Sequence, residues 1–167
     1  MDPQQLHLWV NHIPVAGSFW VLAVLLAAVV RPGVALSRVA LGLTVLLSLS
    51  VVATYLTGEP AEEKVEHLPG VVEAAIEEHE ETAKKALVLG IVAGVGALMG
   101  LVLTRSRPES RWPLVPSIVL VGLCALLLAL AAHEGGKIHR PELGENLEVT
   151  AWTTPCDPSS CSKAGAS

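Results

Sequence analysis

The chain has 167 residues, of which 51% are hydrophobic and only 16% are charged, and its formal net charge at pH 7 is −5. Soluble domains carry charges on about 25% of their residues, so this composition excludes an ordinary water-soluble enzyme. Four long stretches lack Asp, Glu, Lys and Arg altogether: residues 3–30, 39–58, 86–104 and 112–133. Because about 20 apolar residues cross the hydrocarbon core of a bilayer, these stretches predict an all-α integral membrane protein, a four-helix bundle.

The first helix is expected to begin at Pro3, with Asp2 as its N-cap, and to end at Val30. The spans and the outer cap make up a predicted transmembrane domain of residues 1–142: spans at about 11–30, 39–57, 86–104 and 113–133, and the cap at 58–85. A polar extramembrane tail, residues 143–167, is expected to follow.

Glycine and proline predict how the outer ends of these helices are broken. The second span is expected to end at Gly58 and to be followed by a separate short acidic helix that starts at Pro60. The third helix is expected to run unbroken from near Val71 to Leu103. Gly135-Gly136 is expected to end the fourth helix.

Basic residues predict the orientation. The two short connections hold five arginines against one acid, Glu109: Arg31, Arg38, Arg105, Arg107 and Arg111. The other side of the membrane holds the remaining six basic residues and fifteen acids. Since short loops rich in arginine stay in the cytoplasm, both termini and the acidic cap are expected to face outward.

The third helix carries a stripe of small residues at spacings of three and four: Ala83, Ala86, Gly90, Ala93, Ala97 and Gly100. Such a stripe is typical of close helix packing in lipid. A cavity for a flat cofactor is the alternative interpretation.

All six histidines lie on the predicted outer side: His7, His12, His67, His79, His133 and His139. Neutral imidazole is the commonest metal ligand and a usual haem ligand, and helix bundles build such sites from several helices. The alternative is that outer segments hold most polar residues, so histidine gathers there without a common function.

Helical phasing separates the candidates. His79 lies on the same side of its helix as Val72, Ala75 and Ala83, whereas the neighbouring glutamates lie about 100° or more away, so it is expected to face the interior. His12 is expected at the membrane boundary, above which His79 stands by roughly 10 Å.

By height His79 therefore pairs better with His7 and His139 than with His12. We take His12, His79 and His7 as candidate cofactor ligands, and we add His139 and His133 as candidate metal ligands. For His133 the alternative is a cap at the end of the fourth helix.

The cysteines add one structural hypothesis. Cys156 and Cys161 lie in the outer tail, where an oxidising compartment favours a local disulfide, with a soft-metal site as the alternative. Cys124, in the fourth span, is expected to be a small buried apolar residue.

Four segments, residues 6–17, 55–58, 67–80 and 135–142, resemble a bacterial family of four-helix inner-membrane proteins. That family is related to a membrane domain of unknown function whose first helix opens with a His-x-Pro element. The resemblance implies a four-helix bundle in the bacterial inner membrane and marks His7, His12 and His79 as matching the family pattern. The last segment departs from the pattern, because Arg-His-Pro-Glu is expected where this chain has His139-Arg140-Pro141-Glu142.

These observations predict a membrane protein with a periplasm-side histidine site. The site would bind b-type haem, or a copper or zinc ion, for electron transfer to a periplasmic cytochrome or as an accessory to a respiratory complex. The alternative is a cofactor-free structural or assembly subunit that docks a partner through its acidic outer face. The chain carries no signature of a known catalytic site, so it is not predicted to be an enzyme by itself, and nothing in it indicates nucleic-acid binding.

Overall fold

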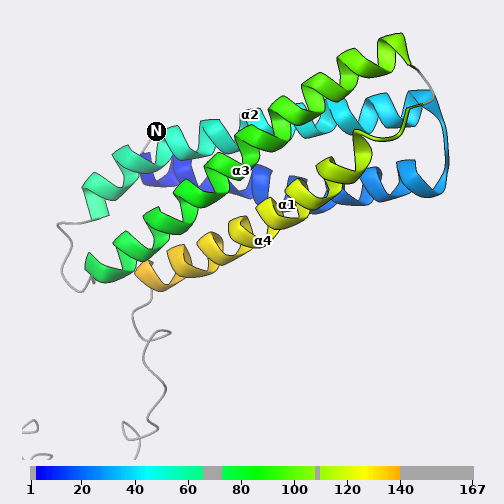
Figure 1. The fold of residues 1–167 in the computed structure, drawn as a ribbon. Helices are drawn as coiled ribbons and strands as arrows, with labels where there is room; N and C mark the ends of the chain where they lie inside the picture. The colour runs from blue at the N-terminus through cyan, green and yellow to red at the C-terminus, as the bar shows by residue number, and fades with distance from the viewer. Residues whose placement is uncertain (1–2, 66–72, 108–109, 140–167) are drawn as a thin grey trace, which may run out of the picture.

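The computed structural model describes residues 3–65, 73–107 and 110–139, and these residues form four α-helices without a strand. The helices are α1 (Pro3–Val30), α2 (Val34–Val65), α3 (Glu73–Ser106) and α4 (Leu114–His139). They lie alongside one another as an elongated bundle (Figure 1), which confirms the predicted all-α four-helix architecture. All four helices are long and apolar enough to cross a membrane. The chain is thus a multi-pass membrane protein.

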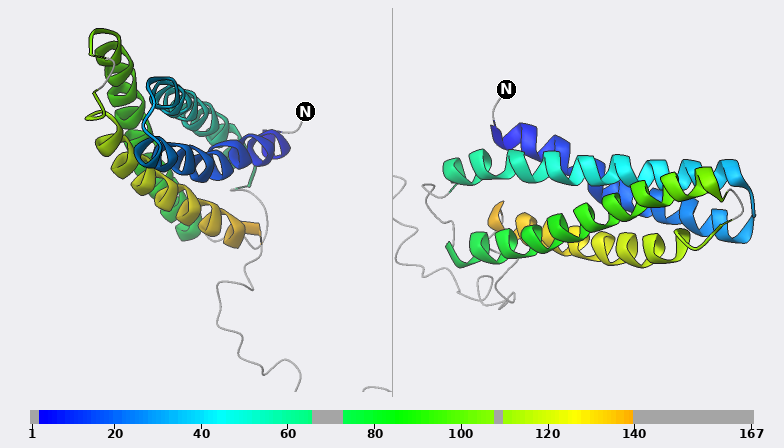
Figure 2. Two further views of the ribbon diagram at one scale, coloured as in Figure 1. Left: turned by 90° about the vertical axis from the view of Figure 1, so that its right-hand side faces the viewer. Right: turned by 45° about the horizontal axis from the view of Figure 1, so that its top comes forward.

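Each helix packs against its neighbours in a closed ring. α1 packs against α2 and α4, and α3 packs against the same two helices, whereas α1 and α3 do not pack against each other. Figure 2 shows the same arrangement from two further directions. α1 and α3 therefore occupy opposite corners of the bundle, and any group that joins them must bridge its middle.

The bundle has two distinct ends, which we name by their residues. The histidine end holds the start of α1, the end of α2, the start of α3 and the end of α4. The arginine end holds the two short connections, α1 to α2 and α3 to α4. There Arg38 Nη2 donates a hydrogen bond of 2.9 Å to the carbonyl of Thr104, which joins α2 to the last turns of α3.

The small residues of α3 pack the core closely, as the first interpretation of that stripe predicts. Ala86, Ala93 and Ala97 are at most 3% exposed. A Cβ atom on Gly90 would lie 3.1 Å from Val51, and one on Gly94 would overlap the Ser48 side chain, both on α2. Glycine at these positions lets α3 approach α2 closely.

Pro14 explains a polar contact between α1 and α2. Proline has no N–H, so in a helix it leaves the carbonyl four residues earlier, here Val10, without its usual donor. The Thr54 hydroxyl lies 3.4 Å from that carbonyl, and 2.9 Å from the Ser50 carbonyl of its own helix. The buried Pro14 thereby creates an acceptor on α1 that a hydroxyl on α2 approaches.

Two expected helix ends are wrong. α2 continues through Gly58 and Pro60 to Val65 instead of breaking into a separate short helix, and α4 continues through Gly135 and Gly136. In both cases a side chain from another helix packs against the glycine. A Cβ atom on Gly58 would be in ordinary contact with the His7 ring at 3.5 Å, whereas one on Gly135 would crowd the His79 ring at 3.3 Å, so Gly135 makes room for that ring.

Candidate histidine site

A cavity of about 140 Å³ lies at the histidine end, with all four helices in its wall. His7 and Asn11 come from α1, and His79 and Glu80 come from α3. The remaining wall residues are Val51, Thr54, Tyr55 and Gly58 on α2, Ala83 and Ala86 on α3, and Leu128 and Ala131 on α4. The cavity thus occupies the space between the opposite corners of the bundle, with one histidine from each corner.

His79 is held by α4. Its Nδ1 lies 2.9 Å from the carbonyl oxygen of Ala131, and the ring is half-buried. Because a carbonyl can only accept, Nδ1 carries the proton in this hydrogen bond, and the Nε2 lone pair is left for another partner. A Cβ atom on Gly135 would stand 3.3 Å from His79 Cε1, so the ring rests against bare backbone at that position.

His7 is oriented in the same way by α2. Its Nδ1 lies 3.2 Å from Thr57 Oγ1, and the Thr57 hydroxyl donates its own proton to the Thr54 carbonyl at 2.8 Å. With that proton used, Thr57 Oγ1 accepts from His7, so Nδ1 is again the protonated nitrogen. In the neutral ring of His7 the lone pair therefore also lies on Nε2.

This arrangement resembles the support that proteins give to metal-binding histidines. A ligating imidazole almost always donates its other N–H to a carbonyl, carboxylate or water, which fixes both the tautomer and the ring direction. Both rings have this support, from Ala131 and from Thr57. Within the described part of the chain, however, no group of three or more His, Cys, Asp or Glu side chains is placed to hold a metal. An ion between His7 and His79 would need water or an external group to complete its coordination.

Glu80 is the acidic group in the cavity wall. Its carboxylate lies 2.7 Å from Lys84 Nζ, an i,i+4 ion pair in which both side chains are about half exposed. Such an exposed pair contributes only a few tenths of a kcal/mol, about 0.3–0.5. The carboxylate is consequently free to exchange partners at little cost.

The other predicted site residues lie elsewhere. The His12 side chain is exposed, and its Nδ1 bonds to the Leu8 carbonyl of its own helix. His133 is also exposed, and it lies six residues before the end of α4, so it does not cap that helix. His139 is the last residue of α4.

Several predictions fall outside the described residues. These are the tail of residues 143–167 with its Cys156–Cys161 disulfide, His67, and the surroundings of the His139 side chain. Cys124 is buried, with its Sγ 3.6 Å from the Ala86 carbonyl, which confirms its predicted role as a small core residue.

The structure adds residues that the sequence reasoning did not select. Thr57, Ala131 and Gly135 hold or accommodate the two rings, and only their position in the assembled bundle reveals this. Glu134 is a further one, because its Oε2 is buried without a hydrogen-bond partner among the described residues. It precedes Gly135 directly but does not line the cavity.

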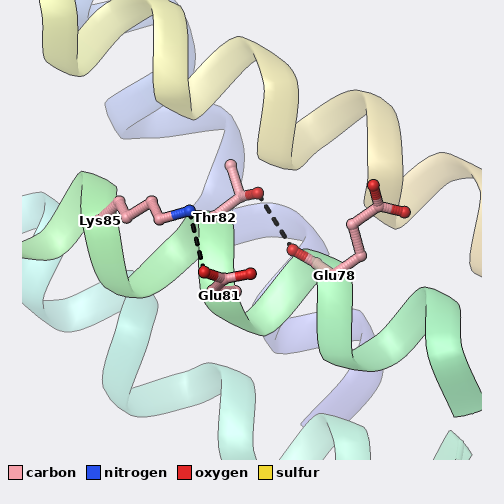
Figure 3. Close-up of polar contacts among 4 residues, drawn as sticks. All are labelled: Glu78, Glu81, Thr82 and Lys85. Atoms are coloured by element: carbon pink, nitrogen blue, oxygen red, sulfur yellow. Dashed lines mark hydrogen bonds and ion pairs between the residues drawn. The ribbon is translucent and has the colours of Figure 1, made fainter.

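An exposed acidic face accompanies the site on α3. Glu77, Glu78 and Glu81 are exposed, and Figure 3 shows two of them beside Thr82 and Lys85. Glu81 pairs with Lys85 Nζ at 3.0 Å, and the Thr82 hydroxyl donates to the Glu78 carbonyl oxygen at 3.0 Å. Both contacts stay within α3, and neither of them uses the carboxylate of Glu78.

Comparison of the chain with protein-family models, with curated proteins and with solved structures finds no match.

Proposed function

We propose that this membrane protein binds a transition-metal ion between His7 and His79, and that the bound ion serves electron transfer or a respiratory complex to which the protein is an accessory. The observation that carries the proposal is the pair of imidazoles from opposite corners of the bundle. Each donates Nδ1–H to a fixed acceptor, and both side chains line one shared cavity.

The size of the cavity favours an ion over haem. A closed cavity of about 150 Å³ accepts a ligand the size of benzene, and this cavity measures about 140 Å³. A haem macrocycle is several times larger than benzene, so the volume of the cavity favours an ion. An ion with one or two waters fits the space as it stands.

The donor set favours copper for the electron-transfer role. Imidazole suits zinc, copper, iron and nickel, but zinc has no redox chemistry in proteins. Two imidazoles with a bound water would hold copper in either oxidation state. A zinc ion at the same place would instead stabilise the bundle by joining α1 to α3.

The proposed location of the site is the periplasmic face of a bacterial inner membrane. Arginine-rich short connections stay in the cytoplasm, and the arginine end holds both of them. The histidine end and its exposed acidic face would then meet periplasmic partners, such as a basic cytochrome.

The decisive experiment measures cofactor and metal in protein purified in detergent. Visible spectra and elemental analysis are recorded for the purified protein, followed by titration with Cu(I), Cu(II) and Zn(II). Mutation of a residue that supports a metal ligand lowers metal affinity by about 10–100-fold. Removal of one of two imidazole ligands is expected to lower the affinity more than that. We therefore expect His7→Ala and His79→Ala each to lower copper affinity by more than about 100-fold.

His12→Ala is the matched control, because its imidazole is exposed and bonds within its own turn. Its affinity is expected to equal that of the unmodified protein. A Soret band would select haem instead of an ion. Failure of every ion and of haem to bind would favour the alternative, a cofactor-free assembly subunit that docks a basic partner through Glu77, Glu78 and Glu81.

A further inference from the structure

A second hollow lies at the arginine end, on the outer surface between α3 and the start of α4. Its volume is about 740 Å³, and it is lined by Gly96, Leu98, Met99, Gly100, Val102, Leu103, Ser106, Trp112 and Pro113. Nearly all of these residues are apolar, and Met99, Val102 and Trp112 are more than 60% exposed. In a membrane protein such a surface faces lipid. The kind of molecule that occupies the groove is therefore inferred from the shape of the groove and from the charges beside it.

The shape of the groove comes from glycine. A Cβ atom on Gly96 would meet nothing within 4 Å, so its missing side chain leaves open space in the wall. Gly100 closes the bottom, since a Cβ there would lie 2.6 Å from Pro113. From Gly96 to Ser106 the helix rises by about 15 Å. That is half of the roughly 30 Å hydrocarbon thickness of a bilayer, the depth reached by an acyl chain of one leaflet.

Three arginines are sequence neighbours of the lining residues Ser106 and Trp112, and we call this end of the groove its mouth. Arg105 and Arg107 flank the lining residue Ser106, and Arg111 precedes the lining residue Trp112. All three arginines are exposed. Basic residues at the membrane surface attract anionic lipid headgroups, and guanidinium binds phosphate in a bidentate manner.

We propose that this groove binds an anionic phospholipid, with one acyl chain along Gly96–Ser106 and the phosphate headgroup at Arg105, Arg107 and Arg111. The apolar wall meets the arginines at the mouth at the depth where the acyl chains of such a lipid join its headgroup. A second copy of the chain would be a poor occupant, because it would bring the same arginines together at the mouth. The proposal does not depend on the histidine site.

The test uses a variant that fills the groove without disturbing the fold. Gly96→Leu projects into open space, and Gly122→Leu on α4 does the same away from the groove, which makes it the matched control. Each protein is purified in detergent with phosphatidylglycerol or phosphatidylcholine, and the lipid retained per chain is measured by native mass spectrometry.

We expect the unmodified protein and Gly122→Leu to retain phosphatidylglycerol in preference to phosphatidylcholine, and Gly96→Leu to lose the retained lipid. Since one basic residue at the surface contributes about 1 kcal/mol to the attraction, Arg107→Gln or Arg111→Gln is expected to lower the preference about fivefold each. Equal retention of the two lipids would overturn the proposal. So would unchanged retention in Gly96→Leu, or a dimer that Gly96→Leu dissociates.

Discussion

Gly135→Ala tests how tightly α4 holds the His79 ring. The added methyl group would stand 3.3 Å from His79 Cε1 and 3.4 Å from Nδ1, which is closer than side chains normally approach. The ring must therefore move by a few tenths of an ångström, and the hydrogen bond from Nδ1 to the Ala131 carbonyl lengthens from 2.9 Å. A neutral hydrogen bond of this kind contributes about 0.5–1.5 kcal/mol.

The neighbouring glycine supplies the control. Alanine is favoured over glycine in a helix interior by up to about 1 kcal/mol, and Gly136 has nothing within 4 Å of its Cβ position. Gly136→Ala thus gains helix stability without touching the ring. We expect Gly135→Ala to be less stable than Gly136→Ala by about 1 kcal/mol, measured by thermal unfolding in detergent.

Ion binding gives a second readout of the same change. Displacing a supporting group lowers metal affinity by about 10–100-fold, so Gly135→Ala should bind copper more weakly than Gly136→Ala by a factor in that range. Equal affinity and equal stability in the two variants would refute the inference that α4 positions His79.

Three further predictions concern other parts of the bundle. Gly94→Ala places a methyl group against the Ser48 side chain and is expected to destabilise the protein by about 1–3 kcal/mol. Gly96→Ala is the control and is not expected to destabilise it, because its Cβ position is open. Equal melting temperatures of the two variants would contradict the close packing of α3 on α2. Glu134→Gln removes a charge from a position where one carboxylate oxygen is buried without a partner among the described residues. The substitution is expected to stabilise the protein by about 1 kcal/mol. A lower melting temperature would show that the carboxylate has a stabilising partner. Acidification from about pH 7.5 to about pH 5 is expected to release a bound ion, since imidazole binds metals in its neutral form; unchanged ion content by elemental analysis would argue against imidazole ligands.

The fold could be predicted from sequence because charge is so sparse. Each span is marked by the absence of Asp, Glu, Lys and Arg, and this signal depends only on the cost of burying charge in lipid. The inward direction of His79 was also predictable, because helical phase relates it to Ala83 and the small residues below. Height along the helices favoured His7 and His139 over His12 as neighbours of His79, and the structure places His7 and His79 in one cavity wall.

The helix ends at Gly58 and Gly135 could not be predicted in this way. Local rules treat glycine near a helix end as a terminator, but here imidazoles from other helices pack against the two glycines. The same holds for Thr57 and Ala131, which select the tautomers of the two rings. Their roles depend on how α1 and α3 meet α2 and α4, and no local sequence pattern encodes that contact.

The interior below the cavity determines how a bound ion would respond to its surroundings. Beneath Ala86 and Leu128 the bundle is closed by Leu25, Leu41 and Val121, each less than 2% exposed. An ion could enter and leave only from the histidine end, so its occupancy would follow the ion activity of that compartment alone.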